Sequence, residues 1–395
     1  MTRIGLQNII LKLVLGIILI TSGLPLSTLV NAQQLPLVEQ KIYLPIIFNR
    51  YHHGFSTEEK FIGIFMKYTW NNQTVGNINT ANNLANKKHA VIGWSIGLQN
   101  HAFTSQARSD LSNNFYGQLE TLWINGYISF INISSEQQHE WTSDQNCPYN
   151  ATAKQIADGF CDRAIRKMAE LYNYWLSQGD GRKAFIAPFP EMNGVDSYGK
   201  PWTSYGGDKD NFILAYKRMQ AIFIENGISR NQIWWVFAPN GWHDRITQPH
   251  HAFEFYYPGD EIVDVVGFSS YNFGYCCVAN PWNSWDNYEE IFEPYIHRFN
   301  QLAPHKPIII AQTGVTAEDF NDPDRYVNEK NAWLNTNYSW LVSQPSILGV
   351  IYFDINADCK WSITSEGSTF SSGYRDGARN FKVPTIQDFN MILGD

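Results

Sequence analysis

Basic side chains are in the minority in this chain of 395 residues, with 29 Lys and Arg against 37 Asp and Glu and a formal net charge of −8. Nucleic-acid-binding proteins need a basic face, so this balance argues against a nucleic-acid partner. Charged residues make up only 17% of the chain and hydrophobic residues 44%, which is a globular composition and not a disordered one.

Several catalytic and metal-binding motifs are missing from the sequence. Neither Cys-x-x-Cys nor His-Glu-x-x-His occurs, which argues against a structural zinc site or a zincin. A Gly-x-Ser-x-Gly nucleophile elbow and a phosphate-binding glycine loop are also missing. We therefore expect neither a metal ion nor an organic cofactor.

Long apolar runs are confined to the N-terminus. Arg3 and Lys12 precede the apolar residues 13–20, and small residues follow at a cleavage spacing that ends at Ala32. This pattern predicts a secretory signal peptide over residues 1–32 and an extracellular protein with no membrane association after cleavage. The alternative is an uncleaved membrane anchor, for which the run is short.

Cysteines are few and odd in number, five in all. Export permits disulfides. Cys147 and Cys161 bracket a short polar segment and form one candidate pair. Cys359 has two candidate partners, Cys276 and Cys277, and sequence alone does not choose between them.

The rest of the chain alternates short apolar runs with longer stretches of helical periodicity. After a leader over residues 33–60, eight strand candidates are rich in β-branched and aromatic residues, as parallel strands buried on both faces are: 61–69, 89–97, 127–133, 183–190, 232–238, 263–271, 307–312 and 347–354. The clearest helical stretches are 153–178, 208–226, 284–302 and 325–343. Pro384 suits the first turn of a final helix.

This alternation predicts a single (β/α)8 TIM barrel over residues 61–395. The helices after the first two strands are poorly marked, so an open doubly wound sheet is the alternative. No repeat or low-complexity linker divides the chain, and we expect a monomer.

Aromatic residues are abundant, at 15% of the chain. In a (β/α)8 barrel the functional residues follow the carboxyl ends of the strands. Aromatic and amide side chains gather at those positions, a composition that suits a saccharide cleft because rings stack on pyranoses and amides bind hydroxyls. They include Trp70, Trp94, Asn193, Trp242, Tyr271, Gln312, Asp354 and Trp361.

Glu191 is the strongest single candidate for chemistry. It follows an apolar strand, so the barrel places it at the catalytic rim. A carboxylate in an apolar, aromatic pocket has a raised pKa and serves as a general acid.

The Pro-Glu-Met-Asn-Gly segment around Glu191 resembles the acid/base motif of glycoside hydrolase family 26, the retaining β-mannanases and related β-glycanases built on a (β/α)8 barrel. Five further segments resemble the family in the same order, and the similarity spans about residues 61–365: 157–162, 234–241, 264–272, 306–314, and 351–354 with Trp361.

The resemblance implies roles for particular residues. Glu191 is the expected acid/base, Tyr271 the expected hydrogen-bond partner of the nucleophile or the adjacent sugar, and Trp361 a stacking platform. Asn193, Trp202 and Trp242 are expected to line the cleft.

Two positions depart from the family pattern. Pro190 stands where the family commonly has His before the acid/base. Gln312 stands at the end of the seventh strand, where the family has its nucleophilic Glu. An amide is isosteric with a carboxylate but is a poor nucleophile, so the covalent intermediate of a retaining mechanism is hard to form.

Four explanations for Gln312 stay open. The protein binds glycan without cleaving it; another carboxylate takes the role, Asp354 first and then Glu318 or Asp319; an N-acetyl group of the substrate acts as nucleophile; or the residue is an engineered knockout. The expected function is thus action on a β-linked polysaccharide, β-mannan or a related β-glucan, as an O-glycosyl hydrolase. The alternatives are an inactive glycan-binding protein and a structural surface protein.

Overall fold

The computed structural model describes residues 54–67, 72–98, 112–135, 147–148, 150–179, 181–195, 199–241, 252–276, 285–318, 326–365, 369 and 371–394. The predicted signal peptide and most of the leader lie outside the described residues. Among the helices that are described, none combines the length and the apolar character needed to cross a membrane.

Eight parallel strands close into a barrel in sequence order. They are β1 (Phe61–Phe65), β2 (Val91–Gly97), β3 (Ile128–Ser134), β4 (Ala184–Pro188), β5 (Ile233–Phe237), β6 (Val265–Asn272), β7 (Ile308–Val315) and β8 (Ile347–Phe353). Because β8 pairs with β1, the sheet has no edge, and the open doubly wound alternative is excluded. The predicted (β/α)8 fold is confirmed.

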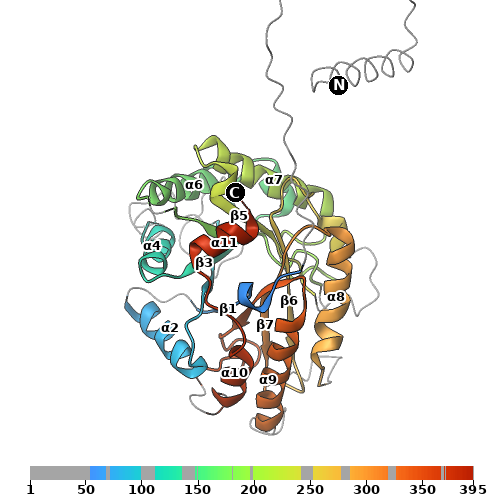
Figure 1. The fold of residues 1–395 in the computed structure, drawn as a ribbon. Helices are drawn as coiled ribbons and strands as arrows, with labels where there is room; N and C mark the ends of the chain where they lie inside the picture. Colours follow the sequence, from blue (N-terminus) through green and yellow to red (C-terminus); the bar gives the residue numbers. More distant parts are fainter. Residues whose placement is uncertain are drawn as a thin grey trace, which may run out of the picture. The chain divides into compact units, whose positions relative to one another are not determined.

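Helices surround the barrel (Figure 1). They are α2 (Asn72–Ala85), α4 (Gly117–Ile124), α5 (Ala153–Ala157), α6 (Asp162–Leu176), α7 (Lys209–Glu225), α8 (Tyr288–Leu302), α9 (Val327–Ser343), α10 (Ser371–Ala378) and α11 (Ile386–Leu393). Helices α2 and α4 fill the two connections that carried no clear helical pattern. The stretch predicted as one helix over 153–178 is two helices, because Gly159 adopts a positive φ of 94° between them.

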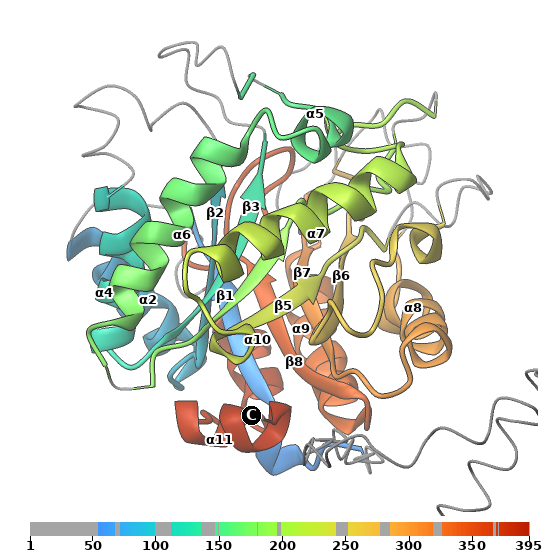
Figure 2. The ribbon, with the colours of Figure 1, turned by 90° about the horizontal axis from the view of Figure 1, so that it is seen from above.

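Buried side chains of the strands fill the barrel interior. Helix α11 closes the end where the strands begin (Figure 2). The ring of Phe389 on α11 lies 5.3 Å from the ring of Phe61 and 5.7 Å from that of Trp234, both near the start of their strands. Pro384 is not in the first turn of this helix; it precedes Thr385, whose hydroxyl caps the helix by accepting a hydrogen bond from the Asp388 amide. The functional residues of such barrels lie at the opposite end, where the strands have their carboxyl ends.

Two disulfides fasten the loops of the barrel. Cys147 pairs with Cys161, as predicted, and Cys276 pairs with Cys359, which decides between the two candidate partners. Cys277 lies outside the described residues.

Candidate active site

Glu191 follows β4 in a constrained backbone segment. Its φ is +60°, and that of Phe189 is +52°, a region where non-glycine residues carry strain of about 1–3 kcal/mol. The backbone is held there because the Glu191 amide donates to the Ala238 carbonyl at 2.8 Å and its carbonyl accepts from the Gly194 amide at 2.9 Å. The surrounding barrel therefore fixes the direction of the Glu191 side chain.

The Glu191 carboxylate is held by two neighbouring strands. It accepts hydrogen bonds from the side chains of Ser269 on β6 and of Asn240, beyond β5. Burial raises the pKa of Glu191, and these two hydrogen bonds oppose the rise only in part. Among the described residues no second carboxylate contributes to the shift. A half-buried carboxyl with a raised pKa is suited to holding and delivering a proton.

Gln312 reaches the same place through an irregularity in β7. Ile309 and Ala311 belong to the interior core, and strict alternation would turn the next residue outward. The register between β6 and β7 shifts at Phe268 and Ser269, so Gln312 becomes the direct neighbour of Ser269. The bulge thus brings Gln312 beside the residue that binds Glu191.

Tyr271 connects the two candidates. Its hydroxyl donates to Oε1 of Gln312 at 2.8 Å. The pKa of Tyr271 is raised well above its usual value, first by burial and then by the charge of Glu191. Tyr271 therefore lies within electrostatic reach of Glu191 while contacting Gln312, and the structure brings together these three residues.

Asn193 is fully buried, and its side chain hydrogen-bonds the backbone of Asn240. Its Nδ2 donates to the Asn240 carbonyl at 2.9 Å, and its Oδ1 accepts from the Asn240 amide at 2.8 Å. The expectation that Asn193 lines the cleft is therefore not met. Instead it ties the end of β4 to the end of β5 and so positions Asn240, a partner of Glu191.

Trp361 lies behind Tyr271. Its ring centroid is 5.2 Å from that of Tyr271 and 4.9 Å from that of Phe273, and only 3% of the residue is exposed. The Trp361 carbonyl accepts from the Tyr352 hydroxyl at 2.7 Å. A ring so enclosed supports Tyr271 and does not offer an open stacking face.

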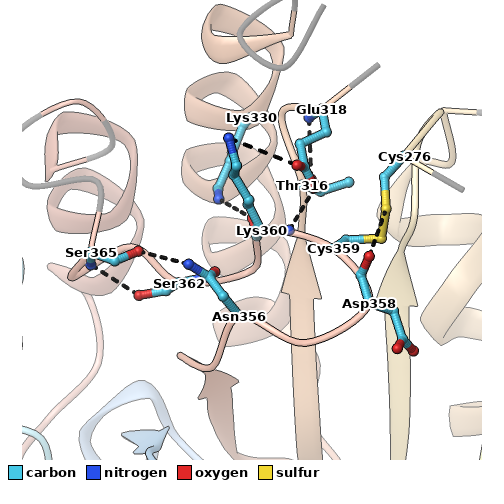
Figure 3. A network of polar contacts seen from close by, with 10 residues as sticks. All are labelled: Cys276, Thr316, Glu318, Lys330, Asn356, Asp358, Cys359, Lys360, Ser362 and Ser365. Atoms are coloured by element: carbon cyan, nitrogen blue, oxygen red, sulfur yellow. Dashed lines mark hydrogen bonds and ion pairs between the residues drawn. A yellow bond between two sulfur atoms is a disulfide. The ribbon is translucent and has the colours of Figure 1, made fainter. Parts of the chain in front are cut away.

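The loop after β8 that carries Trp361 is fastened at several points (Figure 3). The Glu318 carboxylate accepts from the Lys360 amide at 2.6 Å. Lys330, fully buried on α9, donates to the carbonyls of Lys360 and Trp361 at 3.3 Å each. Together with the Cys276–Cys359 disulfide, these contacts fix the loop relative to β6, β7 and α9.

Asp354 holds the same loop from the end of β8. Its carboxylate accepts hydrogen bonds from the Ser362 hydroxyl at 2.9 Å, the Ile363 amide at 2.6 Å, the Thr364 amide at 3.1 Å and the Thr364 hydroxyl. Burial raises its pKa, and these hydrogen bonds oppose the rise. Asp354 and Glu318, the proposed substitutes for a nucleophile, are thus both engaged by the backbone of one loop. Asp319 lies outside the described residues.

The remaining predicted tryptophans have different surroundings. Trp202 is 41% exposed and its indole lies flush against Gly194, where an added Cβ would come within 2.0 Å of the ring. Trp94 does not line the cleft, because it is 1% exposed and packs edge-on against Phe115 in the layer between strands and helices. Trp70 and Trp242 lie outside the described residues.

One group of metal-ligand types occurs near the site in the part of the chain that the structure describes. Sγ of Cys276, Sγ of Cys359 and a carboxylate oxygen of Glu318 lie within 4.8 Å of one another. Since the two sulfurs form a disulfide, they offer no thiolate to a metal.

Ser269 and Asn240 both hold Glu191, and neither was predicted to do so. Small polar residues on inward-facing strand positions were the available signal. The register between neighbouring strands decides which of these residues contact each other, and it cannot be derived from the sequence pattern.

Comparison with known proteins supports the same fold. No protein-family model matches the chain. Endoglucanase H of Acetivibrio thermocellus is 26% identical over 261 residues, which cover 64% of this chain and 25% of that protein. Mannan endo-1,4-beta-mannosidase A and B of Caldalkalibacillus mannanilyticus is 24% identical over 231 residues, covering 50% of this chain and 40% of that protein. The chain thus spans less than half the length of these relatives.

Solved structures of mannanases share the barrel. The catalytic domain of the GH26 endo-beta-1,4-mannanase of Bacillus sp. JAMB-750 gives a TM-score of 0.56 at 14% identity and covers 83% of this chain and 88% of that chain. Mannanase man26 of Bacillus subtilis gives 0.51 at 17% identity, covering 83% and 87%. The chain therefore has a GH26 mannanase-like fold.

Proposed function

We propose that this protein acts on a β-linked polysaccharide, β-mannan or a related β-glucan, at the carboxyl end of the barrel, with Glu191 as the general acid/base of a glycoside hydrolase. The observation that carries the proposal is the setting of Glu191. It is a carboxyl of raised pKa, held by Ser269 and Asn240 and facing the Tyr271–Gln312 pair. The names of the similar proteins, an endoglucanase and mannanases, support the substrate class.

In this proposal the protonated Glu191 transfers its proton to the glycosidic oxygen as the bond from that oxygen to the sugar carbon breaks, and a water molecule adds to the carbon in its place. The two hydrogen bonds from Ser269 and Asn240 orient the carboxyl and stabilise the carboxylate that the transfer produces. The proposal puts the reacting carbon between Glu191 and the Tyr271–Gln312 pair. The Tyr271 hydroxyl already donates to Gln312 Oε1, so the Gln312 NH2 group is available to a sugar hydroxyl.

A second candidate, a glycan-binding protein without turnover, is favoured by a specific observation. Gln312 supplies an amide where a retaining enzyme needs a carboxylate, and the nearby Asp354 and Glu318 are engaged by the β8 loop. We propose that binding is retained in either case. Efficient hydrolysis would then require a carboxylate at position 312.

We also propose export of the protein, with removal of residues 1–32. The two disulfides support it, because such bonds persist in oxidising compartments.

The test is release of reducing sugar from β-mannan and mixed-linkage β-glucan by the parent, Gln312→Glu and Glu191→Ala, with the affinity for each glycan measured alongside. We expect the parent to bind, Gln312→Glu to release sugar on the order of 10⁴-fold faster than the parent, and Glu191→Ala to abolish release. Release by the parent that Gln312→Glu does not increase would instead reveal another nucleophile. A parent that neither binds nor cleaves these glycans would refute the proposal.

A further inference from the structure

A second polar patch lies across the mouth of the barrel from Gln312. It consists of Ser95 on β2 and Asn132 on β3, which are direct neighbours in the register of the two strands. In a closed barrel of eight strands in sequence order, β2 and β3 lie opposite β6 and β7. The patch therefore faces the side on which Tyr271 and Gln312 meet.

Both side chains point into the barrel. On β2, Trp94 and Ile96 pack in the layer between strands and helices, so the residue between them faces inward. On β3, Ile131 and Ile133 pack in that same outer layer, which turns Asn132 inward by the same alternation. Ser95 and Asn132 are thus on the inner wall near the carboxyl ends of their strands.

The inner wall is open to solvent at Ser95. Ser95 is exposed although the other residues of β2 are buried, so solvent reaches the inner face of the barrel at this point. The neighbours on that face are small: Gly93 and Gly97 flank Ser95 along β2, and Ala187 on β4 is the register partner of Asn132. The ring of Phe65 covers Gly93 and forms an apolar floor below.

Asn132 carries a polar atom without a protein partner. The residue is only 5% exposed, and its Oδ1 is buried with no hydrogen-bond donor among the described residues. A buried carbonyl left unpaired costs free energy, so such an atom calls for a donor that is absent from the free protein. A sugar hydroxyl is a donor of this kind, and an aromatic floor beside amide and hydroxyl groups matches the two faces of a pyranose.

We propose that Ser95 and Asn132 are sugar-binding residues and that Oδ1 of Asn132 accepts a hydrogen bond from a hydroxyl of the bound glycan. The inference rests on the proposed function, because it takes the ligand to be a β-linked polysaccharide. It adds a second wall to the cleft. A bound sugar ring would contact Gln312 and Tyr271 on one side and Ser95 and Asn132 on the other.

The experiment measures the affinity for mannohexaose and cellohexaose, and the melting temperature without ligand, for the parent, Asn132→Leu and Ser95→Ala. Leucine has the same number and branching of side-chain heavy atoms as asparagine and removes the unpaired carbonyl. Ser129→Ala is the matched control, because Ser129 is on β3 too but is buried and faces the outer layer.

We expect the dissociation constant to rise about tenfold in Asn132→Leu and about threefold in Ser95→Ala, and to be unchanged in Ser129→Ala. The melting temperature of Asn132→Leu should equal or exceed that of the parent, because the substitution removes a buried carbonyl that has no hydrogen-bond partner among the described residues. If Asn132 had a purely structural role, its replacement would lower the melting temperature. Ser95→Ala removes one exposed hydroxyl and keeps the test valid even if leucine is not accommodated.

Parent-like affinity in both Asn132→Leu and Ser95→Ala would overturn the inference. A parent that binds neither oligosaccharide would refute the proposed function, and this inference with it. The two failures are distinguished by the parent alone.

Discussion

The two disulfides should contribute unequally to stability and to binding, and the chain supplies its own comparison. Cys276 and Cys359 are 83 residues apart, whereas Cys147 and Cys161 are 14 apart. The two closed loops do not overlap along the chain. Each can therefore be opened without changing the length of the other.

The magnitude follows from the entropy of loop closure in the unfolded chain. For separations of 83 and 14 residues, the chain-entropy relation gives about 4.5 kcal/mol and about 3 kcal/mol of stabilisation. We therefore expect Cys276→Ser/Cys359→Ser to lower the free energy of unfolding by more than Cys147→Ser/Cys161→Ser does, with a difference of about 1.5 kcal/mol.

The effect on binding should separate the pairs more sharply. Cys359 lies two residues before Trp361 in the loop that supports Tyr271, and the disulfide joins this loop to the end of β6. Releasing it leaves the contacts from Glu318 and Lys330 to hold the loop. We expect the affinity for glycan to fall several-fold in the Cys276–Cys359 variant and to stay at the parent value in the other.

Urea unfolding at equilibrium measures the first quantity, and calorimetric titration with mannohexaose below the unfolding transition measures the second. The reasoning about loop length fails if opening the 14-residue loop costs as much as opening the 83-residue one. The reasoning about the β8 loop fails if both variants bind glycan like the parent.

Two further substitutions test the surroundings of Glu191. Since burial raises the pKa of Glu191 in the folded protein, its ionisation costs stability above the pKa of the unfolded chain; Glu191→Gln should thus be more stable than the parent at pH 8 and equal to it below about pH 4. Urea unfolding at both pH values checks this, and a pH-independent difference would contradict it. In Gly194→Ala, the new Cβ would lie 2.0 Å from the indole of Trp202 and displace it. We expect several-fold weaker glycan binding with little loss of stability, because Trp202 is 41% exposed; unchanged binding in titration calorimetry would place Trp202 outside the cleft.

The barrel was predictable because its signal is repeated. Each strand is a short apolar run buried on both faces, and every predicted run overlaps an observed strand, with β3, β6 and β7 ending one to three residues beyond the predicted bounds. Helix α2 was not predictable in the same way. Its sequence is rich in Asn, and few of its residues are buried: Ile78, Ala81 and Ala85. So narrow a buried face leaves almost no periodic pattern to detect.

The position of a site residue was predictable where that residue follows a clearly apolar strand. It was not predictable where the register between strands determines which way a side chain points. Glu191 comes directly after the apolar β4, and its place at the carboxyl end follows from the fold alone. Trp94 was misplaced because only its proximity to a strand end was considered; alternation with Ile92 and Ile96 indicates an outward side chain. Gln312 is the reverse case, since alternation points it outward and the bulge turns it inward.

Under the proposed function, one atom type at position 312 would decide the chemistry. The acid side of the site is complete without Gln312, since burial, Ser269 and Asn240 set the state of Glu191. Tyr271 makes a hydrogen bond to Gln312 that a carboxylate oxygen would accept equally well. The fold around position 312 therefore accommodates an amide and a carboxylate alike, because both present an acceptor to Tyr271 in the same shape. Covalent catalysis needs a negatively charged oxygen, and glutamine has an uncharged NH2 donor in its place.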